Sequence, residues 1–181
     1  MIIVFTGNGK GKTTAALGQA LRAVGRGKRA LMVQFIKGPW RSGEDYSAKL
    51  LSRERANNVT GGGFVLKKMG KGFVGILGDS LPRAEHKNAA REALRYAEQE
   101  LATGSWDLLV LDEVNVALSL KLLSLRDVLH FVKHVPPQTL AILTGRGAPK
   151  ALLAAADYAT EMREIKHPFA SGKLAKIGIE F

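Results

Sequence analysis

The sequence predicts a three-layer α/β fold, in which a mainly parallel sheet carries helices on both faces. Short apolar runs alternate with longer amphipathic segments along all 181 residues, as they do in successive βαβ units with right-handed crossovers. Two of the runs, 30–35 and 106–111, are almost continuously apolar, which is typical of strands buried on both faces. The length of 181 residues predicts a single domain spanning residues 1–181, and the 46% of hydrophobic residues are enough for a real core.

The first third of the chain predicts a strand, a glycine-rich loop, a helix, a second strand and a second helix. An apolar run at 2–5 breaks into the loop 6–14, and apolar residues then recur at helical spacing over 15–24 until two glycines end the pattern. The buried strand at 30–35 follows. A loop containing glycine and proline then precedes the helix expected at 44–56.

The middle third contains a segment without a clear period. A weak strand is expected at 61–69, and residues 70–82 then interleave four glycines with apolar side chains. This segment is either a loop that contacts a ligand or a hairpin packed on the core. Pro82 is tolerated at a helix start, and a long helix is expected at 84–101. The run at 106–111 is the clearest central strand.

The last third continues the alternation of helices and strands. Ser124 and Asp127 resemble part of a capping box, which predicts a helix that begins there and ends near His134. The remaining elements are expected to be strands at 140–143, 158–162 and 177–181 and a short helix at 149–156.

The glycine-rich loop after the first strand predicts a phosphate-binding site. Its amide groups, the N-terminus of the next helix and the point charge of Lys12 converge on one place, which suits a polyphosphate. The loop is one residue shorter than the usual G-x-x-x-x-G-K-[ST], because Thr6 stands where the first glycine belongs. We therefore predict a nucleoside triphosphate site on a sheet of the P-loop NTPase (RecA-like) type. The residues expected to bind the nucleotide are Gly7, Asn8, Gly9, Lys10, Gly11, Lys12, Thr13 and Thr14.

An acidic pair at the end of the clearest strand predicts a Mg²⁺ site. Asp112 and Glu113 follow a run of apolar residues, and the carboxyl ends of parallel strands meet at one edge of a sheet. A carboxylate there can hold Mg²⁺, directly or through water, opposite the hydroxyl of Thr13. Either acid could be the direct ligand. Taken alone, Asp112 could instead cap the following helix.

Three other features carry less information. His130 and His134 share a helix face, but no third ligand accompanies them, so we expect an exposed face rather than a metal site. Arg146 lies on a glycine-flanked turn, where it either reaches an anion or pairs with a neighbouring acid. Arg22 lies beyond the first turn of the first helix, and by itself it is interpreted as a surface arginine.

Composition excludes several classes of protein. The chain has 27 basic and 16 acidic residues and a net charge of +11, which can concentrate an anionic nucleotide or nucleic acid. No apolar run approaches the roughly 18 residues of a membrane span. Met1 leads into the first strand without a basic leader, so we expect a cytoplasmic protein with no membrane partner. The absence of cysteine excludes disulfides, thiolate metal sites and a cysteine nucleophile.

Taken together and in this order, the motifs resemble those of the P-loop family of ATP:corrinoid adenosyltransferases. The matching segments are GNGKGKTTAA (7–16), RAVG (22–25), VQFIKG (33–38), GE (43–44), LDE (111–113), LTGRG (143–147), EMR (161–163), KHPF (166–169) and GIEF (178–181). The resemblance implies that the 5′-deoxyadenosyl group of ATP is transferred to the Co(I) of a reduced corrinoid and that triphosphate is released. It also implies a homodimer, a separate electron donor for cobalt, no nucleic-acid partner, and ATP bound in reverse relative to ordinary P-loop NTPases.

The same resemblance assigns roles to particular residues. Lys12 would stabilise the triphosphate leaving group, and Asn8 and Arg22 would help to hold the nucleotide. Phe73 matches an aromatic residue that displaces the lower axial ligand of the corrinoid in the family, so Lys12 and Phe73 are expected to carry the reaction. Burying an apolar ring against that face would also exclude water from cobalt. Gly75 is a departure, because better-known members have a tryptophan at this position.

Two other functions are compatible with parts of the pattern. The loop, the acidic strand end and the positive charge also fit a RecA-like ATPase that binds nucleic acid. A corrinoid carrier that retains the fold without turnover is a third interpretation.

Overall fold

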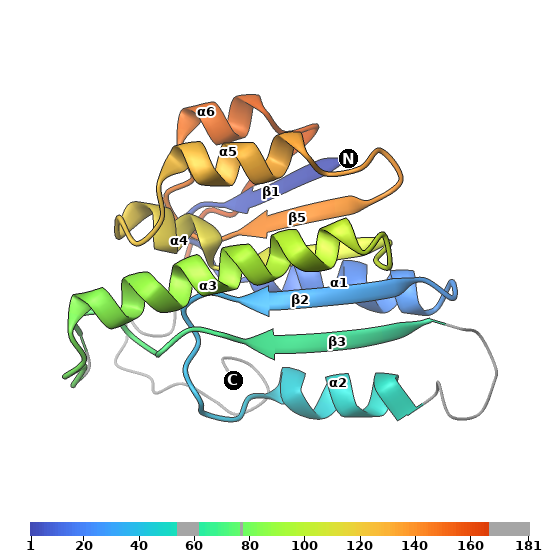
Figure 1. The fold of residues 1–181 in the computed structure, drawn as a ribbon, viewed down its shortest axis with the longest axis horizontal. Helices are drawn as coiled ribbons and strands as arrows, with labels where there is room; N and C mark the ends of the chain where they lie inside the picture. The colour runs from blue at the N-terminus through green and yellow to red at the C-terminus, as the bar shows by residue number, and fades with distance from the viewer. Residues whose placement is uncertain (54–61, 77, 167–181) are drawn as a thin grey trace.

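The computed structural model describes residues 1–53, 62–76 and 78–166, which form a parallel sheet flanked by helices (Figure 1). The strands are β1 (Ile2–Thr6), β2 (Arg29–Gln34), β3 (Gly63–Lys68), β4 (Leu108–Asp112), β5 (Leu140–Thr144) and β6 (Tyr158–Glu161). The helices are α1 (Lys12–Val24), α2 (Gly43–Arg53), α3 (Arg83–Ala102), α4 (Val114–Ser119), α5 (Leu125–Lys133) and α6 (Lys150–Ala154). The strands lie in the order β3-β2-β4-β5-β1-β6, and every neighbouring pair is parallel. The predicted α/β class is therefore confirmed.

Alternate residues of the central strands enter two separate cores. On β4, Leu109 and Leu111 belong to the core formed with α3, α4 and α5, whereas Leu108 and Val110 belong to the core formed with α1. Figure 1 shows α3 and α5 in front of the sheet and α1 behind it. Burying a side chain of this size contributes about 1.5–3 kcal/mol, so both faces of the strand stabilise the fold. This two-sided burial explains why β4 is apolar at nearly every position.

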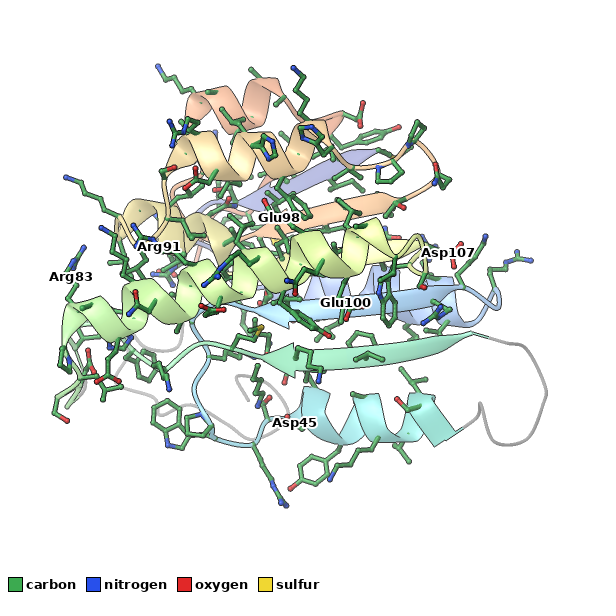
Figure 2. The ribbon with its side chains drawn as sticks, in the orientation of Figure 1. Asp45, Arg83, Arg91, Glu98, Glu100 and Asp107 are labelled. Carbon is green, nitrogen blue, oxygen red and sulfur yellow. The ribbon has the colours of Figure 1, made fainter. Side chains whose placement is uncertain are left out.

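Helix α3 illustrates how the pattern of small apolar residues sets the packing face. The side chains turned to the sheet are Ala89, Ala90, Ala93, Leu94, Ala97 and Leu101, all of them buried. Arg83 and Arg91 lie on the outer side of the helix (Figure 2). Pro82 stands at the N-cap with φ −56°, a geometry that suits a helix start. Neither α3 nor any other described helix is long and apolar enough to cross a membrane.

Two helix starts show how local contacts define the boundaries. Helix α1 begins at Lys12 rather than at residue 15, because Gly11 (φ +112°) turns the loop directly into the first helical turn. The amide of Ala15 donates to the Gly11 carbonyl at 2.7 Å. Ser124 caps α5 as predicted, since its hydroxyl accepts a hydrogen bond from the Asp127 amide at 3.2 Å. At the first of these two starts, the glycine-rich loop is therefore continuous with α1.

Helix α4 is the element that the sequence does not predict. It has six residues, fewer than two turns, so no helical period can be recognised in it. Some predicted features lie outside the described residues, and the structure does not bear on them. These are the strand at 177–181, the end of the helix at 54–56, residue 61 of the weak strand, residue 77 of the segment 70–82, and the motif segments 167–169 and 178–181.

Candidate functional site

The carboxyl ends of β1, β4 and β5 meet at one edge of the sheet, where the structure contains a cavity of about 840 Å³. Ligands of open parallel sheets bind at this edge. The polar and aromatic residues that line the cavity come from the loop after β1 and from the segments that follow the other strands. They include Asn8, Lys10, Lys12, Thr13, Thr14, Lys37, Glu44, Phe73, Glu113 and Arg146, together with Gly9 and Gly11. The structure therefore brings most of the predicted loop residues and one of the two acids to a single cavity.

The glycine-rich loop is held in a shape that depends on its glycines. Gly7 has φ +92°, and a Cβ atom there would lie 2.4 Å from the carbonyl oxygen of Met162. The amide of Gly9 donates to the same carbonyl at 2.7 Å. Lys12 folds back over the loop, where its Nζ donates to the carbonyls of Gly7 at 2.8 Å and Gly9 at 2.7 Å. Burial lowers the pKa of Lys12, although the charge of Glu113 opposes this. The loop is thus preformed around a buried lysine.

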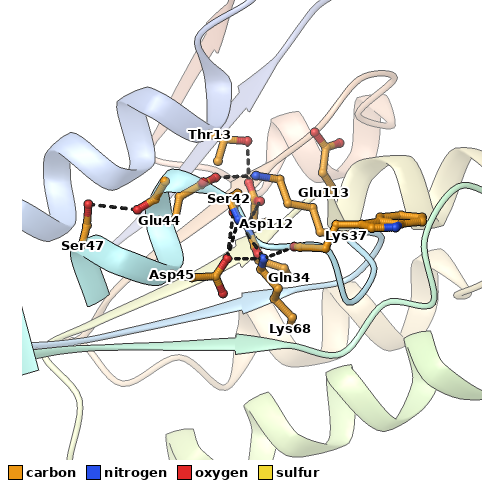
Figure 3. A network of polar contacts seen from close by, with 12 residues as sticks. Thr13, Gln34, Lys37, Ser42, Glu44, Asp45, Ser47, Lys68, Asp112 and Glu113 are labelled. Carbon is orange, nitrogen blue, oxygen red and sulfur yellow. Dashed lines mark hydrogen bonds and ion pairs between the residues drawn. The ribbon is translucent and has the colours of Figure 1, made fainter. Parts of the chain in front are cut away.

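Asp112 is the centre of a buried hydrogen-bond network (Figure 3). Its Oδ1 accepts from the hydroxyls of Thr13 at 2.8 Å and Thr144 at 2.7 Å, and its Oδ2 accepts from Nε2 of Gln34 at 3.0 Å. Burial raises the pKa of Asp112, although these hydrogen bonds oppose the shift. The N-cap of α4 is Glu113, so the interpretation of Asp112 as a helix cap is wrong. Asp112 instead joins α1 to three neighbouring strands.

Glu113 differs from Asp112 in both backbone and environment. Its φ of +63° lies in the left-handed region, which costs an ordinary residue about 1 kcal/mol and often marks a functional site. The Glu113 amide donates to the Thr144 hydroxyl at 3.0 Å. Burial, followed by the charge of Asp112, raises the pKa of Glu113 to about 7. Within the part of the chain that the structure describes, the Glu113 carboxylate accepts no hydrogen bond, and it lines the cavity. This carboxylate is therefore available to a ligand.

The structure adds two charged residues that the sequence reasoning left without a role. Lys37 follows β2 and forms an ion pair with Glu44 at the start of α2 (Figure 3), and both side chains line the cavity. Burial alone would raise the pKa of Glu44, but the hydrogen bonds from Lys37, Ser42 and the backbone, together with the charge of Lys37, lower it overall. Both residues lie in segments that carry the family resemblance, which is the signal that could have identified them.

Arg146, on the turn after β5, also lines the cavity. No carboxylate among the described residues lies within 4.0 Å of its guanidinium group, so none of these residues forms the ion pair that was one of its two interpretations. Its position favours the other one, in which it reaches an anion. Lys12, Lys37 and Arg146 together give the cavity a cationic lining, and the charge of each acts to lower the pKa of Glu113.

Phe73 is the described residue of the 70–82 segment that reaches the cavity. The described part of this segment forms no strand, so the hairpin interpretation is wrong and the interpretation as a loop beside a ligand is favoured. The Phe73 ring is 47% exposed and lies 6.0 Å from the ring of Trp40. Trp40, which is 63% exposed, is an aromatic residue that the sequence reasoning missed, because nothing in the sequence connects positions 40 and 73.

Arg22 and the two histidines of α5 lie elsewhere. Arg22 is exposed in the last turn of α1 and is not among the residues that line the cavity. His130 and His134 stack on the exposed side of α5, with ring centroids 4.1 Å apart. Across residues 1–53, 62–76 and 78–166, no group of three His, Cys, Asp or Glu side chains could hold a metal ion. The interpretation of the two histidines as an exposed helix face is consistent with this geometry.

Together, the parallel sheet, the glycine loop with its buried lysine, and the acidic end of β4 define a P-loop nucleotide-binding protein of the α/β class. Comparison with known sequences identifies the family. The family model of ATP:corrinoid adenosyltransferase BtuR/CobO/CobP matches residues 1–181, so the chain belongs to this family. The predicted resemblance is confirmed, and the alternative of a RecA-like nucleic-acid ATPase is not favoured.

Similar proteins carry the same description. The corrinoid adenosyltransferase of Escherichia coli (strain K12) is 40% identical over 181 residues, which cover 100% of this chain and 85% of that protein. Corrinoid adenosyltransferase CobA of Salmonella typhimurium is 37% identical with the same coverage. A solved ATPase from a type III secretion system aligns with a TM-score of 0.39 and 17% identity over 94% of this chain and 48% of that chain, a similarity too low to carry an inference.

Proposed function

We propose that this protein transfers the 5′-deoxyadenosyl group of ATP to the Co(I) of a reduced corrinoid and releases triphosphate. The observation that carries the proposal is the composition of one cavity. Lys12, Thr13 and Glu113 supply a site for a polyphosphate and its cation, and the exposed ring of Phe73 lies on the wall of the same cavity. A polyphosphate site that opens onto an apolar aromatic surface suits a reaction between a nucleotide and a large flat cofactor. Membership of the family supports the same conclusion.

We include Mg²⁺ in this proposal, because the oxygen atoms of the site suit it. Mg²⁺ is usually bound by one or two carboxylates or hydroxyls together with waters and substrate phosphates. Both oxygens of the Asp112 carboxylate already accept hydrogen bonds from neighbouring side chains. Glu113 is therefore proposed as the direct carboxylate ligand, and Asp112 as the residue that orients the Thr13 hydroxyl. Bound Mg²⁺ would neutralise charge on the triphosphate.

The proposed reaction requires positioning and charge stabilisation rather than acid–base catalysis. Co(I) supplies the electron pair that forms the cobalt–carbon bond, and the bond between C5′ and the triphosphate oxygen breaks with its electrons on the leaving group. No proton is transferred in this step. The protein must bring cobalt to about 3–3.5 Å from C5′ and stabilise the polyanion. Lys12, Lys37 and Arg146 are suited to the second task, together with the loop amides.

Further parts of the proposal rest on the family rather than on the cavity. A homodimer and a separate electron donor for cobalt are proposed by analogy with related enzymes. Arg22 is left out of the proposed nucleotide site, because its side chain is exposed at the far end of α1.

A spectral assay with product analysis tests the proposal. Purified protein is incubated with ATP, Mg²⁺ and a chemically reduced corrinoid, and the visible spectrum and the nucleotide products are followed together. We expect the spectrum to change as the Co–C bond forms and triphosphate to appear only when the corrinoid is present. ADP as the main product, stimulated by DNA or RNA, would overturn the proposal. Corrinoid binding without turnover would also contradict it and would identify a carrier.

A further inference from the structure

We propose that Trp40 forms, with Phe73, a two-ring aromatic surface that contacts the corrinoid macrocycle and contributes to its selection. The proposal rests on the proposed function, since it names a residue that would contact the corrinoid. It concerns a residue on the segment after β2, far in the sequence from the segment that carries Phe73.

The first observation is the exposure of two apolar rings that touch. Trp40 is 63% exposed and Phe73 is 47% exposed, and their centroids are 6.0 Å apart with an angle of 33° between the planes. Aromatic side chains in contact usually bury most of their surface. Here both residues remain exposed despite the contact, beside a cavity that Phe73 lines. Paired exposed rings next to a cavity suit a flat ligand that covers both of them.

The second observation is that the Trp40 ring packs closely against the backbone of two glycines. A Cβ atom on Gly38 would lie 2.7 Å from the Trp40 ring, and one on Gly72 would lie 2.9 Å from it. The indole is thus seated against two glycines, one from each segment. Nζ of Lys68 donates a hydrogen bond to the carbonyl oxygen of Trp40 at 2.7 Å. The ring is therefore held in place before any ligand arrives, which reduces the entropy cost of binding.

The third observation concerns position 75, two residues after Phe73, where no side chain is present. Position 75 is glycine with φ +69°, and nothing lies within 4 Å of the Cβ that it lacks. A bulky residue in this backbone conformation would be strained. The loop after Phe73 therefore leaves open space at position 75, and the second ring comes from Trp40 on the segment after β2.

The size of the surface favours the corrinoid over the adenine base as occupant. One aromatic ring suffices to stack a nucleobase, whereas two rings side by side present an apolar area broader than a base. The cationic lining formed by Lys12, Lys37 and Arg146 accounts for the triphosphate. Stacking of adenine on Trp40 is the competing outcome, and the experiment below separates the two.

The test combines steady-state kinetics with footprinting of the wild-type chain. Trp40→Ala is expected to raise KM for the corrinoid about tenfold and to leave KM for ATP within about twofold, while Trp40→Phe retains most of the wild-type KM. Tyr158→Ala is the matched control, because Tyr158 is an aromatic residue with 60% exposure on β6, at the opposite edge of the sheet from β3. In hydroxyl-radical footprinting read by mass spectrometry, cobinamide is expected to lower the oxidation of Trp40 relative to that of Tyr158 at least threefold.

The outcomes decide between the alternatives. Protection of Trp40 by ATP alone, or a rise in KM for ATP with an unchanged KM for the corrinoid, would overturn the proposal in favour of adenine stacking. Unchanged oxidation of Trp40 with bound cobinamide would overturn it outright. If wild-type protein adenosylates corrinoids and Trp40→Ala has wild-type KM values, this inference fails while the proposed function stands. Absence of turnover in the wild type would contradict the proposed function, and the footprint would still decide the role of Trp40.

Discussion

Replacing Glu113 with glutamine is expected to stabilise the protein above neutral pH and to weaken its binding of nucleotide. Burial and the charge of Asp112 raise the pKa of Glu113 from 4.5 to about 7. Because the folded chain then binds this proton more tightly than the unfolded chain, the free energy of unfolding falls as the pH rises through the window between 4.5 and 7. At about 1.4 kcal/mol for each pKa unit, ionised Glu113 costs the folded state about 3 kcal/mol at pH 8.

Urea unfolding at two pH values measures this cost. Without nucleotide, Glu113→Gln is expected to exceed the wild type in free energy of unfolding by about 3 kcal/mol at pH 8 and by less than about 1 kcal/mol at pH 5. Glu98→Gln on the outer side of α3 (Figure 2) is the control, with an expected change below about 0.5 kcal/mol at both pH values. A stability difference between Glu113→Gln and the wild type that does not vary with pH would refute the reasoning.

The same unfolding measurement with Mg²⁺ and ATP added identifies which acid binds the metal. A ligand that binds only the folded state stabilises it in proportion to the logarithm of its concentration over Kd, so Mg²⁺ with ATP should raise the unfolding midpoint of the wild type. This gain should be larger at pH 8 than at pH 6, because Glu113 must lose its proton before it can bind a cation. Glu113→Gln should lose most of the gain. If it keeps the full gain, Asp112 rather than Glu113 holds the metal.

Three further substitutions test the glycine-rich loop and Phe73, and a fourth, in α1, serves as a control. Lys12→Ala should abolish adenosyl transfer in the spectral assay while leaving the far-ultraviolet circular dichroism spectrum unchanged, and retained turnover would contradict its role. Phe73→Ala should lower turnover more with a five-coordinate corrinoid than with a base-free one, so equal losses would refute its assignment to the lower face. Gly9→Ala should lower the free energy of unfolding in urea by about 1–3 kcal/mol, because a Cβ there would lie 2.7 Å from the carbonyl carbon of Arg163. Gly18→Ala in the middle of α1, where a Cβ meets nothing within 4 Å, should instead raise it by about 0.5–1 kcal/mol, and similar effects of the two glycine substitutions would contradict this account.

The fold could be predicted from the sequence because its central strands β2 and β4 are buried on both faces. The continuous apolar runs at β2 and β4 arise directly from burial between two layers of helices. Helix α4 was not accessible, since six residues that begin after a left-handed Glu113 show no recognisable period. Local patterns thus predict long regular elements well and short elements that follow a strained turn poorly.

In the candidate site, likewise, some contacts could be predicted from local motifs and others depend on how distant segments pack. Thr13 and Asp112 follow from local motifs, and the structure joins them by a hydrogen bond of 2.8 Å. Thr144 enters the same network only because β5 lies beside β4 in the sheet, and the order of strands cannot be deduced from patterns along one chain. The contact between Trp40 and Phe73 depends in the same way on the packing of two segments that the sequence describes only as loops.

The buried charges of the cavity explain why a polyphosphate with its cation, rather than either alone, suits this site. Burial disfavours the charged form of both Lys12 and Glu113, lowering the pKa of the first and raising that of the second. A triphosphate alone would satisfy Lys12 and repel Glu113, and a cation alone would do the reverse. Together they give each residue an opposite charge. The phosphate oxygens would replace the neutral carbonyls of Gly7 and Gly9 as acceptors for Lys12, a charge-assisted bond about twice as strong. Since the bond that breaks in the proposed reaction leaves the triphosphate intact, this stabilisation persists in the product, and release of triphosphate is expected to be slow.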